Sequence, residues 1–416
     1  MKKPEILSPA GNREMLETAC LYGADAVYMG LAGGMNLRAK AGNFSHETLK
    51  ESVKYAHDRN VRVYLTLNIY PHDRDMGLVK DCIETARNAG IDAVIVSDIG
   101  VASLVKEIWP RAVLHLSTQA NTVNVPAIKA WTGLGIKRVI LARELSADEI
   151  GFIRKNVSTE LEVFIHGSVC ISISGRCLIS SYLNARDANR GECTQPCRWD
   201  YALLEKTRPS QYMPVIEEDG FTYLYNSKDI CLLPVFADVM RLGLDGLKIE
   251  GRNRTPLYVA TVTSVYKEAR DAYLADPEGF SIKPDWLEEI KKTSNREYFT
   301  GFFNGTPGSE SMKYDFKGYE HSHHLAARVI LATGDRAMLE ARNPLIEGME
   351  LEWMSASGER KKFTLNGATQ DGAPVSKIRP NSFFEVRLPF SPLAGELVRK
   401  PYSEGDKVIE RRKRNE

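Results

Sequence analysis

The stretch GADAVYMG, residues 23–30, indicates the fold, because its first five residues return in related form three times along the chain. The related segments are GIDAV (90–94), GIKRV (135–139) and GLDGL (243–247). In each copy the glycine suits the end of a helix, and the apolar residues after it suit the start of a buried strand. Repeated helix–glycine–strand units predict parallel strands joined by right-handed crossovers.

Eight strands are expected in the first 250 residues. They lie at 5–11, 24–30, 61–68, 92–98, 113–119, 137–143, 161–168 and 245–251, with amphipathic helices between them. Eight such units predict a (β/α)8 TIM-like barrel. A doubly wound open sheet is the alternative, but no GxGxxG motif follows the first strand, which disfavours a dinucleotide-binding fold.

Three regions are expected along the chain. Residues 1–280 form the barrel with a cysteine-rich insertion at 169–244, residues 281–323 form a connector, and residues 324–416 form a small C-terminal β-barrel domain. The last region is assigned from short alternating strands that are separated by turns. Such small barrels hold nucleic acid in many proteins, and a purely structural role is the alternative.

The composition excludes several classes of protein. With 43% hydrophobic residues, the chain can bury a core and is not globally disordered. No apolar run is long enough to span a bilayer, and the first residues lack a secretory signal, so a cytoplasmic protein without a membrane partner is expected. The formal net charge is only +1, so an RNA partner would need a local positive surface. The tail KVIERRKRNE (407–416) is one such patch, with a solvated chain end as the plainer interpretation.

The insertion at 169–244 holds the clearest chemical signal. Five of the seven cysteines fall there, namely Cys170, Cys177, Cys193, Cys197 and Cys231. Long insertions in the βα units of a barrel lie over its C-terminal mouth, where active sites form. We therefore expect the cysteines to cover the mouth of the barrel. The other two, Cys20 and Cys82, lie on apolar helix faces and are expected in the core.

Clustered thiolates can bind zinc, bind an iron–sulfur cluster, form disulfides or lie inert in a core. Disulfides need an oxidising compartment, which a cytoplasmic protein lacks. Zinc prefers tight CxxC pairs, whereas the gaps here are six, fifteen, three and thirty-three residues. Such irregular spacing favours an iron–sulfur cluster held by separate loops. Zinc, and structural or redox thiols, stay open as alternatives.

Polar and charged residues follow several of the expected strands at the end that faces the active site of a barrel. We predict His166 and Glu250 as catalytic residues. We predict a set of substrate-binding residues that comprises Asn68, Asp98, Gln119, Arg143, Lys248 and Arg252. Lysine and arginine suit a carboxylate or a phosphate. For each residue the plainer alternative is an ion pair at the rim, and for His166 it is a satisfied core histidine.

The pattern ExFxxGSxCxxxxGxCxxS, residues 162–180, adds a resemblance to these observations. Together with LSPAGN (7–12), GECTQPCRW (191–199) and KIEGR (248–252), it resembles the collagenase-like peptidases of family U32. The resemblance covers most of the chain. It implies a [4Fe–4S] cluster on cysteines that match Cys170, Cys177, Cys193 and Cys231. Relatives that use both cysteines of the CxxxC pair leave Cys197 as a fifth candidate.

The same resemblance implies a function. Better-understood members of the family resemble oxygen-independent hydroxylases of RNA or of ubiquinone precursors. The length of the chain and its single C-terminal β-domain favour the branch that hydroxylates tRNA, giving 5-hydroxyuridine at the wobble position with prephenate as the suggested oxygen source. An electron-transfer partner is also implied.

Two other functions stay open, namely a collagenase-like peptidase and a non-catalytic Fe–S scaffold that binds RNA. Peptidase chemistry finds little support in the sequence, which contains no HExxH or GxSxG motif. Cys170 with His166 is the one pair that suits a thiol peptidase, and a cluster would consume that thiolate.

Overall fold

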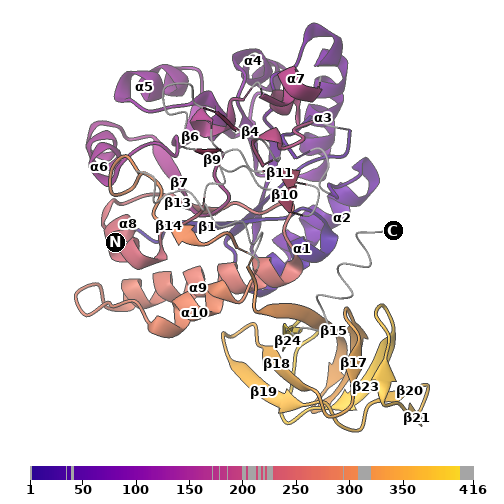
Figure 1. Ribbon diagram of the computed structural model, residues 1–416. Coiled ribbons are helices and arrows are strands. Elements are labelled where there is room, and N and C mark those ends of the chain that lie inside the picture. Colours follow the sequence, from indigo (N-terminus) through magenta and orange to yellow (C-terminus); the bar gives the residue numbers. More distant parts are fainter. Residues whose placement is uncertain are drawn as a thin grey trace.

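The computed structural model shows a closed barrel in the first part of the chain. The residues that it describes are 2–33, 35–38, 42–170, 172–177, 179–184, 186–198, 203–204, 212–213, 217–218, 221–222, 228–293, 295–307 and 320–402. Eight parallel strands form the barrel, namely β1 (Glu5–Pro9), β2 (Ala26–Met29), β3 (Arg62–Leu67), β4 (Ala93–Val96), β5 (Leu114–Leu116), β6 (Ile136–Ile140), β7 (Glu160–Gly167) and β13 (Gly246–Ile249). Since β13 pairs with both β1 and β7, the sheet closes on itself, and the predicted TIM-like barrel is confirmed (Figure 1).

Helices cover the outside of the barrel. They are α1 (Arg13–Leu21), α2 (His46–His57), α3 (Met76–Ala89), α4 (Ile99–Ile108), α5 (Val125–Gly133), α6 (Ala147–Asn156), α8 (Phe236–Arg241) and α9 (Pro256–Ala275). Their starts follow local chemistry: the Asn12 side chain accepts a bond from the Met15 amide, and Ser146 forms a capping box with Glu149. No helix in the described part of the chain is long and apolar enough to cross a membrane.

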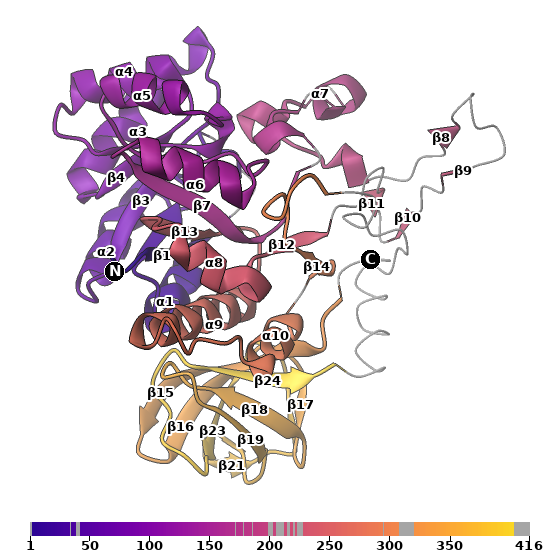
Figure 2. The ribbon, with the colours of Figure 1, turned by 90° about the vertical axis from the view of Figure 1, so that its left-hand side faces the viewer.

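The insertion leaves the barrel where β7 ends. Its described elements include α7 (Ile179–Asn184), the short strand pair β8 (Leu203–Leu204) and β9 (Tyr212–Met213), and the hairpin of β10 (Glu217–Glu218) and β11 (Phe221–Thr222). The sequence around 217–220 predicts a hairpin, which this strand pair confirms. Figure 2 shows this region at one end of the barrel, beyond β7.

One predicted element of the insertion is wrong in part. The sequence of residues 229–242 predicts a helix, but the structure begins with the strand β12 (Asp229–Cys231), and α8 starts only at Phe236. β12 pairs antiparallel with β7 and parallel with β14 (Tyr298–Phe299), so tertiary pairing decides its conformation. Pro234 suits the single 3-10 turn between strand and helix, because it cannot donate within a helix interior.

The C-terminal region is an antiparallel sheet, as the alternating pattern predicted. Its order is β19-β18-β24-β15-β16-β23-β20-β21. The strands are β15 (His323–Thr333), β16 (Arg336–Ala341), β18 (Glu350–Met354), β19 (Arg360–Thr364), β20 (Thr369–Gln370), β21 (Ala373–Pro374), β23 (Phe383–Arg387) and β24 (Leu397–Pro401), with β17 (Leu345–Ile346) paired to β22 (Lys377–Ile378). The basic tail at 407–416 lies outside the described residues.

The C-terminal sheet packs against α9 and α10 (Pro284–Lys291), as Figure 1 shows. The Tyr22 hydroxyl donates to the Met354 carbonyl at 2.7 Å and accepts from the Leu397 amide at 3.0 Å. The buried guanidinium of Arg399 bonds Glu289 of α10 through both terminal nitrogens. These buried contacts fix the sheet to the barrel.

Candidate functional site

A pocket opens at the carboxyl ends of the barrel strands, where the insertion begins. Its space, including the open mouth, is about 980 Å³. Six of the eight residues predicted for catalysis or substrate binding line it, together with four of the five clustered cysteines: Asn68, Gln119, Arg143, Lys248, Glu250, Arg252, Cys170, Cys177, Cys193 and Cys197. The sequence therefore located the pocket, although it did not identify every residue in it.

Arg38 is the main pocket residue that sequence reasoning missed. It lies in the loop after β2, and its Nη2 is 3.1 Å from Glu250 Oε1. The loop carries no regular apolar pattern, so nothing in the periodicity pointed to it. One signal was its place in the segment that follows a barrel strand, where residues reach the mouth.

Arg252 and Arg143 add two more guanidinium groups to the pocket. Arg252 Nη1 donates to Thr66 Oγ1 at 2.7 Å, and its Nη2 donates to Asn36 Oδ1. Burial lowers the pKa of Arg252 to about 10, so it stays charged at neutral pH. Arg143 Nη1 donates to the Ser168 carbonyl at 2.9 Å, and its Cζ lies 3.9 Å from the centroid of the Phe164 ring. Hydrogen bonds thus hold two cations of the pocket in fixed positions.

Glu250 is the acidic residue among the described lining residues. Burial alone would raise the pKa of Glu250, but Arg38, Arg143 and Arg252 together hold it below its ordinary value. The Tyr28 hydroxyl also donates to its Oε2 at 3.3 Å. Glu250 is therefore ionised at neutral pH, and it forms an ion pair with Arg38.

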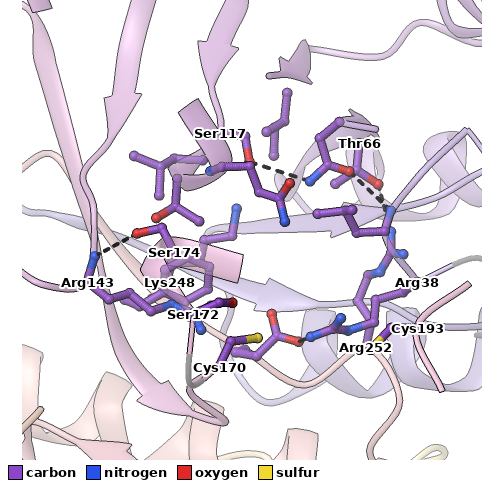
Figure 3. Close-up of a pocket in the computed structure, with 18 of the residues that line it drawn as sticks. Arg38, Thr66, Ser117, Arg143, Cys170, Ser172, Ser174, Cys193, Lys248 and Arg252 are labelled. Carbon is purple, nitrogen blue, oxygen red and sulfur yellow. Dashed lines mark hydrogen bonds and ion pairs between the residues drawn. The ribbon is translucent and has the colours of Figure 1, made fainter. Parts of the chain in front are cut away.

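Lys248 lies deeper in the pocket, between these charges and the closed end of the barrel. Its Nζ is 4.3 Å from the centroid of the Tyr28 ring and 3.5 Å from Glu162 Oε1. Burial lowers the pKa of Lys248, although the carboxylates of Glu162 and Glu250 oppose this effect. Figure 3 shows Lys248 between Arg143 on one side and Arg38 and Arg252 on the other.

A neutral polar wall faces these cations across the pocket. Asn68 Nδ2 lies 3.5 Å from Ser117 Oγ, as the dashed line in Figure 3 marks, and both residues follow barrel strands. The backbone carbonyl of Gln119 accepts from the Tyr70 hydroxyl at 2.6 Å, which fixes the residue, while its Oε1 is buried without a hydrogen-bond partner in the described structure. Such amide and hydroxyl groups can bind the edge of a base.

Two predicted residues lie elsewhere. The Asp98 side chain accepts from the Val101 amide at 2.9 Å and so caps α4, and it does not line the pocket. His166 is fully buried on the outside of the barrel, where its Nδ1 lies 3.3 Å from the Tyr266 hydroxyl of α9. Burial lowers the pKa of His166 to about 3, so its imidazole is neutral. The structure therefore gives these two residues structural positions.

The cysteines gather at the mouth with one exception. Cys170, Cys177, Cys193 and Cys197 line the pocket, whereas Cys231 is buried on β12 opposite His166, with its Sγ 3.6 Å from the Tyr266 hydroxyl. Burial raises the pKa of Cys193, and the nearby thiols of Cys170 and Cys177 raise it further. Among the described residues no three potential ligands lie close enough to share one metal ion. The type and place of the donors fit a thiolate-bound group, but the arrangement is not preformed.

Comparisons with known proteins place the chain in a family. The model of peptidase family U32 matches residues 11–313. The chain belongs to this family. In family U32 it resembles tRNA hydroxylation protein P1 of Bacillus subtilis, with 39% identity over 403 residues that cover 96% of this chain and 95% of the relative. It is 33% identical to tRNA hydroxylation protein P of Escherichia coli, covering 94% of each chain. It is also 34% identical to a protein named Collagenase from Porphyromonas gingivalis, covering 72% of this chain and 73% of that protein.

The structure explains why a glycine stands in the U32 pattern at 167. Gly167 has φ +109°, and a Cβ there would lie 2.5 Å from the backbone oxygen of Glu250. Only glycine allows β7 to turn into the insertion so close to the end of β13. The turn carries the chain toward Cys170 at the mouth of the pocket.

The pair required by a thiol peptidase is not brought together in this U32 chain. Cys170 lines the pocket inside the barrel mouth, whereas His166 faces α9 on the outside of β7. No histidine stands among the described residues that line the pocket. A cysteine nucleophile needs an adjacent base to form its thiolate, so the geometry gives peptide cleavage no support.

Proposed function

We propose that this U32 protein is an RNA hydroxylase that acts on tRNA and forms 5-hydroxyuridine at the wobble position. The observation that carries the proposal is similarity over nearly the whole chain to two proteins named for tRNA hydroxylation. The pocket supports it, because cationic groups that suit a phosphate or carboxylate face a neutral wall that suits a base edge. A wobble base is already exposed in its loop and enters such a pocket at low cost.

A [4Fe–4S] cluster at the mouth is the second part of the proposal. Cys170, Cys177 and Cys193 would supply three thiolates. The family resemblance assigns the fourth to Cys231, whereas the position of Cys197 in the pocket favours that residue. When bound, such a cluster supplies one-electron redox chemistry, which requires an electron-transfer partner.

Prephenate as the oxygen source is the third part. It carries two carboxylates, and the pocket offers Arg38, Arg143, Lys248 and Arg252 against the single carboxylate of Glu250. Guanidinium groups bind carboxylates through paired hydrogen bonds, so this positive excess suits a dianion. Glu250 then orients Arg38, and it can accept a proton that the substrate releases.

Mass analysis of nucleosides from tRNA tests the function. In a strain that lacks this protein we expect 5-hydroxyuridine and its derivatives to disappear from tRNA. The wild-type chain and a Cys20→Ala control should restore them, because Cys20 lies on the core side of α1, whereas Cys177→Ala should not. If the deletion leaves these nucleosides unchanged, the proposed function is wrong. Lost modification with unchanged tRNA binding in Glu250→Gln would separate an enzyme from a scaffold.

Iron and acid-labile sulfide in protein purified without oxygen test the cluster. We expect about four irons per chain, with loss in the alanine variants of Cys170, Cys177 and Cys193. The variants Cys197→Ala and Cys231→Ala decide the fourth ligand, since only one of them should lose iron. Zinc, or no metal, in the wild-type protein would contradict the cluster.

A further inference from the structure

Lys248 is a buried amine in the wall of the pocket. Its side chain is 4% exposed, yet it lines the pocket, so a ligand there meets the amine directly. Its Nζ lies 4.3 Å from the centroid of the Tyr28 ring and 5.4 Å from that of Phe164. These rings belong to an apolar layer inside the barrel that also includes Ile95 and Ile140. Burial away from water disfavours an ammonium ion here, although the faces of the two rings attract one, and so favours the nucleophilic free amine.

Glu162 lies on the other side of the amine and can take its proton. Glu162 Oε1 is 3.5 Å from Lys248 Nζ. The second oxygen, Oε2, accepts from Arg138 Nη1 at 3.1 Å, while Oε1 has no hydrogen-bond partner in the described structure. Oε1 is thus the carboxylate oxygen that faces the amine and can receive its proton. The pair therefore holds one proton that can move between nitrogen and oxygen.

Three guanidinium groups surround the approach to this amine. Arg143 packs on the same Phe164 ring as Lys248, with Cζ 3.9 Å from its centroid. Arg38 and Arg252 lie on the opposite side, as Figure 3 shows. A carboxylate held by these groups would place an adjacent carbonyl carbon beside Nζ. An amine, a proton acceptor and a carboxylate site in one pocket match the chemistry of a 2-oxo acid.

We infer that Lys248 forms an imine with the carbonyl carbon of a 2-oxo carboxylic acid bound in the pocket. The Lys248 ammonium passes one proton to Glu162, and the free amine attacks the carbonyl carbon. A second proton moves from nitrogen to the former carbonyl oxygen, Glu162 returns the first, and the oxygen leaves as water. One C–N double bond replaces one C–O double bond, and nothing is oxidised or reduced.

This inference deepens the proposed function and rests on it for one point, namely that the acid is the co-substrate. The imine holds the acid covalently against the neutral wall of Asn68 and Gln119, where the base would bind. Covalent attachment would also retain a small acid while the large RNA enters and leaves.

Reductive trapping of the holoprotein tests the imine. We would incubate it with pyruvate, or with phenylpyruvate, and sodium cyanoborohydride, then measure the intact mass and map the peptides. We expect one reduced keto-acid adduct per chain, on the peptide that contains Lys248. The Lys248→Arg variant keeps the positive charge and should lose the adduct, whereas Lys54→Arg, a surface ion-pair lysine of α2, should label like the wild type.

The wild-type peptide map decides the question even if a variant fails to fold. An adduct spread over surface lysines, or none at all, would overturn the inference. Acetone, which lacks the carboxylate, should label Lys248 much less than pyruvate; equal labelling would contradict the role of the guanidinium groups. The same preparations are assayed for tRNA hydroxylation, so hydroxylation without an adduct removes the imine and leaves the function. An adduct without hydroxylation would support the imine and contradict the proposed function.

Discussion

The two ends of the barrel carry similar side chains but opposite arrangements. At the amino ends of the strands, the floor network consists of Glu5, Arg62, Arg138, Glu160 and Glu162. Arg138 alone bonds three carboxylates there, at 2.7 to 3.1 Å, and is 4% exposed. At the mouth, three arginines share one carboxylate, Glu250, and open onto the pocket. Charges at the floor pair mainly with one another, and Glu162 also faces Lys248, whereas the cations at the mouth outnumber the one carboxylate there.

Because of this difference, we expect the floor of the barrel to contribute mainly to stability and the mouth mainly to function. In a buried ion network, attraction between the partners offsets the cost of removing each charge from water. Removing one member therefore leaves an uncompensated buried charge. A cation that lines the pocket has an anion as its expected partner. Substitutions at the floor should therefore change folding, and those at the mouth should change binding.

The largest expected effect compares one arginine from each end. Arg138→Met should lower the free energy of unfolding by about 3–5 kcal/mol, because it removes the buried cation that Glu5 and Glu162 share. Arg143→Met loses one bond to a carbonyl and should cost roughly 1 kcal/mol, while it removes tRNA hydroxylation. Urea unfolding and nucleoside mass analysis measure the two effects. Equal losses of stability in the two variants would contradict the proposed difference between the floor and the mouth.

The next largest effect is expected from substituting two glycines, one at each end of the barrel. A Cβ at Gly246 would lie 2.8 Å from Glu162 Oε2 at the floor, so Gly246→Ala should cost about 1–3 kcal/mol of stability. A Cβ at Gly30 would lie 2.6 Å from Asn36 Nδ2 and 2.7 Å from Arg252 Nη1 at the mouth, so both side chains would have to shift. Gly30→Ala should therefore displace Arg252 and weaken anion binding more than folding.

The control for this pair is Gly77→Ala in α3, where a Cβ meets nothing within 4 Å. It should change neither property for the worse, since alanine suits a helix better than glycine. Thermal unfolding and the keto-acid trapping yield report the two properties separately. A larger loss of stability in Gly30→Ala than in Gly246→Ala would contradict this comparison.

The smallest expected effect is a pH dependence at the mouth. Arg38, Arg143 and Arg252 hold the pKa of Glu250 below its ordinary value of 4.5 despite burial. The ionised carboxylate thus stabilises the fold above pH 4.5, and this contribution disappears as pH falls through the lowered pKa. Glu250→Gln should be less stable than the wild type at about pH 6, and the difference should shrink toward about pH 3. A difference that stays constant in thermal unfolding would contradict the ion pairing.

The barrel could be predicted from the sequence because its signals are local and repeated. Glycines such as Gly90 do end helices, with φ +81°, and the apolar residues that follow do form strands. β12 could not be predicted this way, since its three residues extend only because β7 and β14 pair with them. Its partners are far away in the sequence, and periodicity does not register them.

His166 shows why the candidate site was harder to predict than the fold. Strand alternation puts Glu162, Phe164 and His166 on one face, and the first two do face the interior of the barrel. The pairing of β7 with β13 then shifts, from Lys248 with Phe164 to Ile249 with His166. This irregularity reverses the alternation and turns His166 toward α9. The residue types around 165 do not indicate a bulge.

The prediction for Asp98 was wrong for another reason. An aspartate between a strand and a helix can either line the site at the end of the strand or cap the helix. Here the Asp98 side chain accepts a hydrogen bond from the Val101 amide and caps α4. By contrast, Arg143, Lys248 and Arg252 reached the pocket as expected, because no local backbone group competes for a long cationic side chain. Sequence position therefore predicts pocket residues best when the side chain is long and is not a good cap.

The contact between the barrel and the C-terminal sheet sets the design of truncation experiments. Tyr22, Leu257 and Ala260 of the barrel share a buried apolar cluster with Met354 and Leu397 of the sheet. A fragment that ends before β15 would expose this cluster and would leave Glu289 without Arg399. Its failure to bind RNA would report damage to the fold rather than a lost recognition surface. Substitution of exposed residues such as Lys361 and Lys362 on β19, which leaves the contact whole, is the informative route.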